Sequence, residues 1–281
     1  MTVQRYALGE PYWVIAHHSR FQSHNRMHAD GLPQALGFRG AFVVGIATFG
    51  NMTRALVDTF GDRWLGHALL DVRFVKPVCE GDRIRVETLP VAGRDAECAY
   101  EVCAYNETAD GELCARMETT IPAQLPSVDC AASIPPNEWE GPVTQSRTWD
   151  NIVEGQAYRS LRHTLSAVDN AHWAQILEDD LELYARGTTP ALHPAHVLRQ
   201  VQLGYNNQFI GDNAVHSASR AVLRNTLHVG DTVDVLTVPL KKWEKKANHW
   251  LTIYCAVRRE GEVCAEIWHT QIIKLRGANP D

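Results

Sequence analysis

The feature that most constrains this chain is that its two halves resemble each other. Residues 67–91 read HALLDVRFVKPVCEGDRIRVETLPV, and residues 216–240 read HSASRAVLRNTLHVGDTVDVLTVPL. A shift of 149 residues places the first segment on the second and aligns His67 with His216. Further along, GELCA at 111–115 matches GEVCA at 261–265 at a shift of 150 residues. Two blocks that recur in the same order at nearly the same shift predict a duplicated structural unit.

Each half also shows the same order of predicted elements. A polar, histidine-containing lead-in is followed by a helix, predicted at 41–60 in the first half from apolar residues spaced about 3.6 apart. The helix of the second half is predicted at 194–209. Four strand-like segments follow each helix, separated by turn signals such as Glu80-Gly81-Asp82. The predicted strands are 67–75, 82–91, 96–105 and 113–121, then 214–226, 231–241, 248–258 and 262–274.

One helix followed by strands joined through short turns predicts an α+β unit with an antiparallel sheet, because parallel strands need long crossovers. An apolar helix next to such a sheet is expected to be wrapped by it. Residues 126–147 are rich in proline and show no periodicity, which is typical of a linker. The sequence therefore predicts an N-terminal domain at 1–125, this linker, and a C-terminal domain at 148–281.

The composition narrows the classes of function. Hydrophobic residues make up 45% and charged residues 21% of the 281 residues, with a formal charge of -6, as in a globular protein. The only dense basic run is 241–246, which is typical of a solvated hairpin end, so no nucleic-acid partner is expected. No apolar run reaches the roughly 20 residues that span a bilayer, and the N-terminus has no secretory apolar region.

The seven cysteines are odd in number and lack CxxC spacing, which argues against a disulfide framework and a zinc site. We therefore expect a cytoplasmic protein with reduced thiols. The sequence also lacks a dinucleotide fingerprint, a P-loop, a GxSxG elbow and an HExxH motif. No cofactor and no metal are expected.

A wrapped helix in each of two repeats, with Gly-Asp before a strand, resembles the hotdog fold. The closer resemblance is to fused, two-domain MaoC-like enoyl-thioester hydratases and dehydratases, and it covers nearly the whole chain. The family's motif runs from an Asp through Asn-Pro to a His, with a His-Gly at the start of the central helix. FQSHNRMHAD at 21–30 occupies this motif, followed by Phe42-Val43-Val44-Gly45. This resemblance implies a double hotdog, an α+β fold.

The match keeps part of the motif and loses part of it. The residues kept are Asn25, His28, Asp30 and Gly45. Ser23 stands at the position of the catalytic Asp, Arg26 at that of the Pro, and Val44 at that of the His before the helical Gly.

The resemblance implies a role for each candidate residue. His28 would be the acid/base group, since only His titrates near neutrality without a large shift. Asn25 would hold the water or orient His28. The Gly45 amide would face the thioester oxygen, with Phe42 and Val44 beside the substrate, although Gly45 could instead allow close packing.

Ser23 cannot act as a base near pH 7 without an activating partner. Asp30 or His24 could stand in, or the second half could supply a carboxylate. The candidates there are Asp169, Asp179 and Asp180.

The second half can be aligned in two ways. In one, Asp179 to Tyr184 occupies the motif, with Tyr184 at the His position and His193-Pro194 at the start of the central helix. In the other, 168–173 followed by Glu178 resembles the Asn-Asn-Ala-x-Tyr and Glu of hotdog thioesterases. The first is preferred, because the Pro-flanked His193 then falls where the other half starts its helix.

Three functions follow from these residues. The first is a lyase that hydrates or dehydrates an acyl-CoA or acyl-carrier-protein thioester. The second is a thioesterase in which Asp169 or Glu178 activates water. The third is a non-catalytic protein that binds a thioester or a hotdog partner. Fold alone does not choose among them. A homodimer is compatible with each, through an exposed sheet edge.

Overall fold

The computed structural model describes residues 6–19, 21, 25–29, 31–94, 98–210 and 214–276. In these ranges ten strands form one sheet in the order β1-β3-β4-β5-β2-β7-β10-β9-β8-β6. Every pairing between the strands is antiparallel. The first-half strands are β1 (Tyr12–Ile15), β2 (Ala68–Phe74), β3 (Arg83–Pro90), β4 (Tyr100–Asn106) and β5 (Glu112–Thr120). Those of the second half are β6 (Leu161–Thr164), β7 (Val215–Leu223), β8 (Thr232–Lys245), β9 (Asn248–Arg259) and β10 (Glu262–Lys274).

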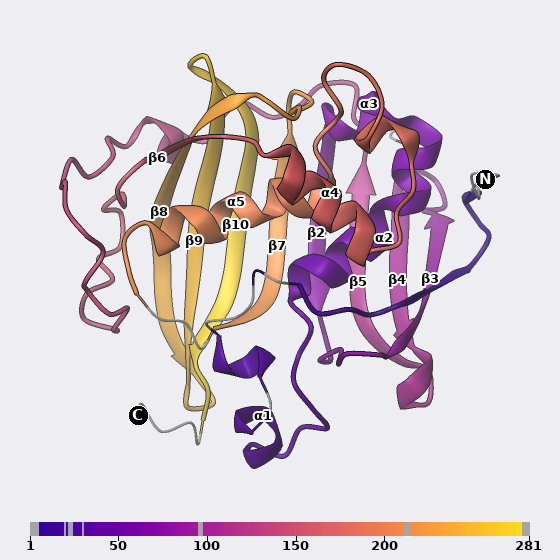
Figure 1. Cartoon of the computed structure of the whole chain (residues 1–281), viewed down its shortest axis with the longest axis horizontal. Helices are drawn as coiled ribbons and strands as arrows, with labels where there is room; N and C mark the ends of the chain where they lie inside the picture. Colours follow the sequence, from indigo (N-terminus) through magenta and orange to yellow (C-terminus); the bar gives the residue numbers. More distant parts are fainter. Residues whose placement is uncertain are drawn as a thin grey trace.

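The sheet repeats itself about its centre. β2 and β7 pair there, from Ala68 opposite Leu223 to Arg73 opposite Ala218. Moving outward, β5, β4, β3 and β1 on one side mirror β10, β9, β8 and β6 on the other. This order confirms the duplication, and each half carries one long helix against its part of the sheet (Figure 1). The fold is a double hotdog.

The two central helices lie side by side on one face of the sheet, α2 (Gly45–Phe60) over the first half and α5 (Pro194–Asn206) over the second (Figure 1). α2 packs against the first-half strands and also against α5, and its residues from Ile46 to Val57 are all buried. Gly50 permits the close approach, because a Cβ there would lie 2.4 Å from Leu177 Cδ1 and 3.2 Å from His193 Cε1.

The predicted helix at 41–60 begins later than expected. Phe42 forms a bridge with Cys79, and the Val43 N–H donates to the Val78 carbonyl at 2.7 Å. These contacts hold the residues before Gly45 in an extended path beside the sheet. Phe42 therefore lies outside the helix whose spacing suggested it.

Two edge strands and three α-helices of the described residues were not predicted. β1 and β6 are edge strands of four residues, which is too short for an alternating pattern to stand out. The helices are α1 (Leu32–Ala35), α3 (Asp62–Leu65) and α4 (Ala167–Ile176). α4 has almost no apolar face to read, since of its residues only Asn170 and Trp173 are buried.

The proline-rich segment at 126–147 lies partly against the second half of the sheet. Ala131 and Ala132 pack in a small cluster with Tyr254, separate from the main core. The Asp129 N–H donates to Glu266 Oε1 at 2.8 Å, and Glu266 is fully buried and paired with Arg224. The domain boundaries at 125 and 148 stay a prediction, but this linker is anchored to the sheet.

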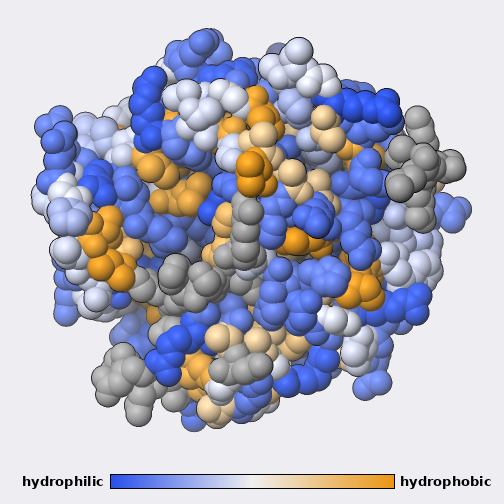
Figure 2. Space-filling model, in the orientation of Figure 1, coloured by the Kyte–Doolittle hydropathy of each residue, from blue (hydrophilic) through white to orange (hydrophobic). Residues whose placement is uncertain are grey.

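The surface on the helix side is mainly hydrophilic. Figure 2 shows apolar residues there in small separate groups between polar ones. Among the described residues, none of the helices is both long and apolar enough to cross a membrane.

Candidate active site

A cavity of about 810 Å³ lies between the two halves, at the N-terminus of α2. The first half contributes the residues after the motif and the end of β2, and the second half contributes the end of α5, the start of β7 and part of β10. Its polar lining includes Asn25, His28, Thr48, Lys76, Gln202, Asn206, His216, Ser217, His269 and Gln271. Most of the remaining lining is aliphatic or aromatic, including Phe38, Phe42, Phe74, Phe209, Ile272 and Leu275. Such a lining suits an apolar ligand with a small polar centre.

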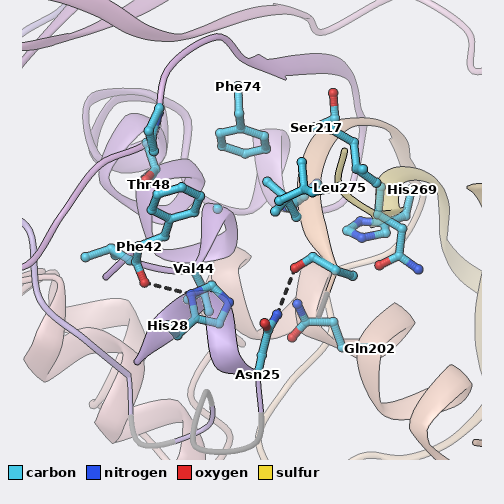
Figure 3. A pocket seen from close by; sticks show the side chains of 18 of the residues that line it. Asn25, His28, Phe42, Val44, Thr48, Phe74, Gln202, Ser217, His269 and Leu275 are labelled. Atoms are coloured by element: carbon cyan, nitrogen blue, oxygen red, sulfur yellow. Dashed lines mark hydrogen bonds between the residues drawn. The ribbon is translucent and has the colours of Figure 1, made fainter. Parts of the chain in front are cut away.

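Asn25 and His28 reach this cavity from a single turn of 3-10 helix, Arg26–His28 (Figure 3). Asn25 caps that turn, because its Oδ1 accepts the Met27 N–H at 2.9 Å. Its Nδ2 donates to the Ala214 carbonyl of the second half at 2.8 Å. Met27, within the turn, is buried. Asn25 thus ties the motif loop to the opposite half of the chain.

The ring of His28 is oriented by the backbone. Its Nδ1 lies 2.7 Å from the Phe42 carbonyl oxygen, which can only accept, so Nδ1 carries the proton (Figure 3). In the neutral ring Nε2 is then the acceptor nitrogen. Ser23 and Asp30, the other predicted catalytic residues, lie outside the described residues, as does His24.

Val44 and Gly45 form the start of α2 at the cavity wall. Val44 is the N-cap residue, and its apolar side chain cannot accept a hydrogen bond from the first turn. The Ala47 N–H turns back to the Val44 carbonyl at 2.9 Å, but the Gly45 N–H has no intrahelical acceptor. An uncapped helix N-terminus of this kind presents N–H donors and the positive end of the helix dipole to a ligand.

The second half contributes a connected pair of histidines that were not predicted from the sequence. His216 Nε2 lies 2.8 Å from Ser219 Oγ, and this oxygen lies 3.2 Å from His269 Nδ1. The two imidazole rings are 4.0 Å apart between centroids. The only sequence signal was the repeat, in which His216 aligns with His67. His67 lies away from the cavity, and its Nε2 donates to the Pro122 carbonyl at 2.8 Å.

Gly45 and His216 touch across the two halves. A Cβ at Gly45 would lie 2.9 Å from His216 Nδ1 and 3.1 Å from His216 Cβ. Real Cβ atoms do not approach other atoms this closely, so glycine is required where the ring packs against the helix. From the sequence, Gly45 could allow either ligand approach or close packing, and its close neighbour in the structure is a histidine of the other half.

Burial keeps several histidines neutral. Burial lowers the pKa of His269 to about 3, with nearby Arg147 adding to the effect. Burial also lowers the pKa of His196, on the inner face of α5, to about 3, with Arg199 adding to it. The pKa of His216 falls well below its usual value, first through burial and then through His269. These rings are therefore uncharged near pH 7.

Acid is expected to destabilise the fold because of these groups. Between the ordinary histidine pKa of about 6.5 and the lowered folded values, the unfolded chain binds more protons than the folded one. Stability therefore falls as pH drops below about 6.5, by up to about 1.4 kcal/mol per pH unit for each such histidine. Urea unfolding at pH 7.5, 6.0 and 5.0 measures this slope. His196→Gln should make it shallower by about one proton, and an unchanged slope would contradict the assignment.

The second half repeats the helix start with different side chains. His193 is the N-cap of α5, with φ of -60° and ψ of 137°, against -60° and 136° for Val44. His193 Nδ1 accepts the Ala195 N–H at 3.1 Å, and Nε2 lies 3.3 Å from Asp179 Oδ2. The Tyr184 ring packs on His193 with centroids 4.6 Å apart. Asp179, Tyr184 and His193 thus lie together at the start of α5.

This second site is filled by the first half. Arg54 of α2 is buried beside it, pairs with Asp180, and has its Nε 3.7 Å from Asp179 Oδ1. The space next to the start of α5 is a mainly apolar cavity of about 20 Å³, room for about one water. Of the two related positions, the one at α2 is therefore the open one.

The carboxylates considered from the sequence lie away from the open cavity. Asp169 is 3.3 Å from Arg199, Glu178 is 3.7 Å from His17, and neither is among the lining residues. No Asp or Glu lines this cavity within the described ranges. The second half supplies neutral histidines there instead.

Comparison with solved structures gives the same fold over nearly the full chain. A protein from Chloroflexus aurantiacus J-10-fl, named as a MaoC-domain dehydratase, is similar with a TM-score of 0.62 at 12% identity, covering 97% of both chains. A Mycobacterium tuberculosis protein described as a double hotdog is similar with a TM-score of 0.61 at 12% identity, covering 96% of this chain and 97% of its own. A protein named as a thioesterase from Novosphingobium aromaticivorans DSM 12444 has a TM-score of 0.53 at 12% identity, over 98% and 100%. No family model and no curated protein matches the sequence.

Proposed function

We propose that the protein is a lyase that adds water to, or removes it from, an acyl thioester carried by coenzyme A or an acyl carrier protein. The observation that carries the proposal is the meeting of the His28 ring and the uncapped start of α2 in one large, mainly apolar cavity. A proton-transfer group and a cluster of N–H donors are what this reaction needs. The fold likeness to proteins named as MaoC-like dehydratases supports the same class.

In the hydration direction, His28 performs the proton transfers. Its Nε2 takes a proton from water while the water oxygen bonds to C3 of the enoyl group. The C2–C3 π electrons move toward the carbonyl, and the thioester oxygen becomes negative. His28 then returns the proton to C2, which restores the carbonyl and the neutral ring. Water is added in full, and dehydration follows the same steps in reverse.

The negative oxygen is stabilised by the start of α2. The Gly45 N–H points outward from the first turn, where no intrahelical acceptor exists. A donor of this kind is effective because it is fixed before the charge develops. Asn25, which bonds to both the motif turn and Ala214, keeps His28 next to this helix start.

The cavity walls favour an acyl chain over a polar substrate. Four phenylalanines, Phe21, Phe38, Phe42 and Phe74, lie on the first-half side. The volume of about 810 Å³ is in the range of drug-sized ligand sites. Hydrolysis of the same thioester is the second candidate, since proteins named as thioesterases share the fold. The positions of Asp169 and Glu178 outside the lining favour the lyase.

The test is to mix the protein with trans-2-enoyl-CoAs of increasing chain length and follow the loss of enoyl absorbance. Free thiol is measured in the same samples. Loss of absorbance without thiol release is the expected result. Thiol release without hydration would replace the lyase with a thioesterase. Neither change at any length, with the matching carrier-protein thioesters also inert, would refute the proposal.

A further inference from the structure

We propose that His216, contributed by the second half, is a second hydrogen-bond donor to the thioester oxygen, and that Ser219 and His269 hold it in position. The inference rests on the proposed function and names a part of the site that the sequence motif does not contain. Its basis is the position of the ring beside Gly45, the connected side chains behind it, and the asymmetry between the two repeats.

A β-bulge brings these residues onto one face. Ser219 lies opposite His269, but the register between β7 and β10 shifts by one residue before His216, which lies opposite Gln271. In a regular strand, residues three apart point to opposite faces. The extra residue, Ser217, turns His216 to the face of Ser219 and His269.

The Nδ1 of His216 is the atom placed for a ligand. It is buried and has no hydrogen-bond partner among the residues that the structure describes, although the ring as a whole lines the cavity. A buried polar atom left without a partner is unfavourable, and such atoms recur where a ligand completes the bonding. Because Nδ1 lies 2.9 Å from where a Cβ of Gly45 would be, a ligand oxygen near the start of α2 is close to both.

The residues behind the ring fix which nitrogen carries the proton. If His269 Nδ1–H donates to Ser219 Oγ, the serine hydroxyl donates to His216 Nε2, and Nδ1 of His216 becomes the donor. Burial and the neighbouring His269 lower the pKa of His216, so the ring stays uncharged. A neutral imidazole is then a fixed donor that does not give up its proton, the role known for histidines that polarise a carbonyl.

The step requires no net transfer from His216. As water adds to C3 and its proton goes to His28, the electron pair that reaches the thioester oxygen is met by the His216 and Gly45 N–H groups. When C2 takes the proton back from His28, the pair returns to the carbonyl. The two histidines therefore divide the work, one moving the proton and the other stabilising charge.

The decisive experiment uses a 4-(dimethylamino)cinnamoyl thioester of coenzyme A as a spectroscopic probe. Hydrogen bonds to its carbonyl pull electrons along the conjugated chain and shift its absorbance to longer wavelength. The shift is measured on binding to the unchanged protein and to variants at His216. Turnover of the best enoyl thioester is measured in parallel.

Two substitutions separate donor from structural roles. His216→Ala removes the donor and is expected to lower kcat about 10²-fold and to reduce the red shift. His216→Asn places an amide N–H near the position of Nδ1, so it should recover much of both. His67→Ala, at the aligned position of the other repeat and away from the cavity, is the matched control and should change neither.

The outcomes are distinct. A full red shift in a folded His216→Ala variant would overturn the inference and leave the proposed function standing. An asparagine variant that recovers the red shift but stays as inactive as the alanine variant would also overturn it, since proton transfer by His216 would then be needed. Failure of the unchanged protein to bind or shift the probe, with no enoyl turnover, would refute the proposed function as well.

Discussion

His28→Ala is expected to lower the hydration rate of an enoyl thioester by about 10²–10⁴-fold, the usual effect of removing a general acid/base group. The effect should fall on kcat more than on KM, because the apolar walls that hold the acyl chain are unchanged. In the scheme proposed above His28 takes and returns the same proton, and no carboxylate among the described lining residues can replace it. Steady-state kinetics on the enoyl substrate measure the loss.

A second variant separates chemistry from folding at this position. His28→Asn keeps an amide N–H where Nδ1 now donates to the Phe42 carbonyl, but it has no nitrogen at the position of Nε2. The His28→Asn variant should therefore unfold at nearly the same temperature as the unchanged protein and still be inactive. His17→Ala, a histidine of the same lead-in that does not line the cavity, serves as the control. An active His28→Asn protein would contradict the acid/base role.

Gly45→Ala is expected to lower kcat by about 10²-fold or more, since one methyl group disturbs two donors together. The new Cβ would lie 2.9–3.2 Å from three atoms of His216, including its own Cβ, so the ring must move. The same methyl group lies beside the N–H that we assign to the thioester oxygen. The probe used for His216 should lose most of its red shift in this variant.

The stability of Gly45→Ala should change much less than its activity. Alanine is favoured over glycine in a helix by up to about 1 kcal/mol, which offsets part of the crowding. Gly40→Ala is the matched control, because a Cβ there would meet Cys79 Sγ at 3.6 Å, an ordinary contact. Full activity in Gly45→Ala would show that neither donor at this helix start matters for the reaction.

The fold could be read from the sequence because its signals are local and occur twice. The matched Gly-Asp turns and strand segments predict the same order of elements in both halves. The strand order in the sheet shows this duplication. The start of α2 was misplaced, since Phe42 continues the apolar spacing of the helix but pairs with Cys79 as an extended residue. Spacing alone does not distinguish a helical residue from an extended one just before it.

Only the residues that the first half contributes to the site could be predicted from the sequence. Asn25 and His28 lie in a motif, and the structure brings both to the cavity with Gly45. His216 and His269 are far from that motif in sequence and come together through a strand pairing with a one-residue shift. No pattern in a single sequence indicates where such a shift occurs. The second-half carboxylates were candidate bases because of their residue type. In the structure Asp180 pairs with Arg54 and Asp169 pairs with Arg199, away from the cavity.

The filling of the second site by Arg54 depends on the two repeats being one chain. In a symmetric homodimer of single repeats, each substitution appears in both subunits. An arginine that closed one site would then close the other, and a histidine added to one wall would be added to both. Joining the repeats removes that restriction. One copy can keep the proton-transfer loop while the other becomes its wall, so titration with a tight-binding thioester should saturate at one ligand per chain.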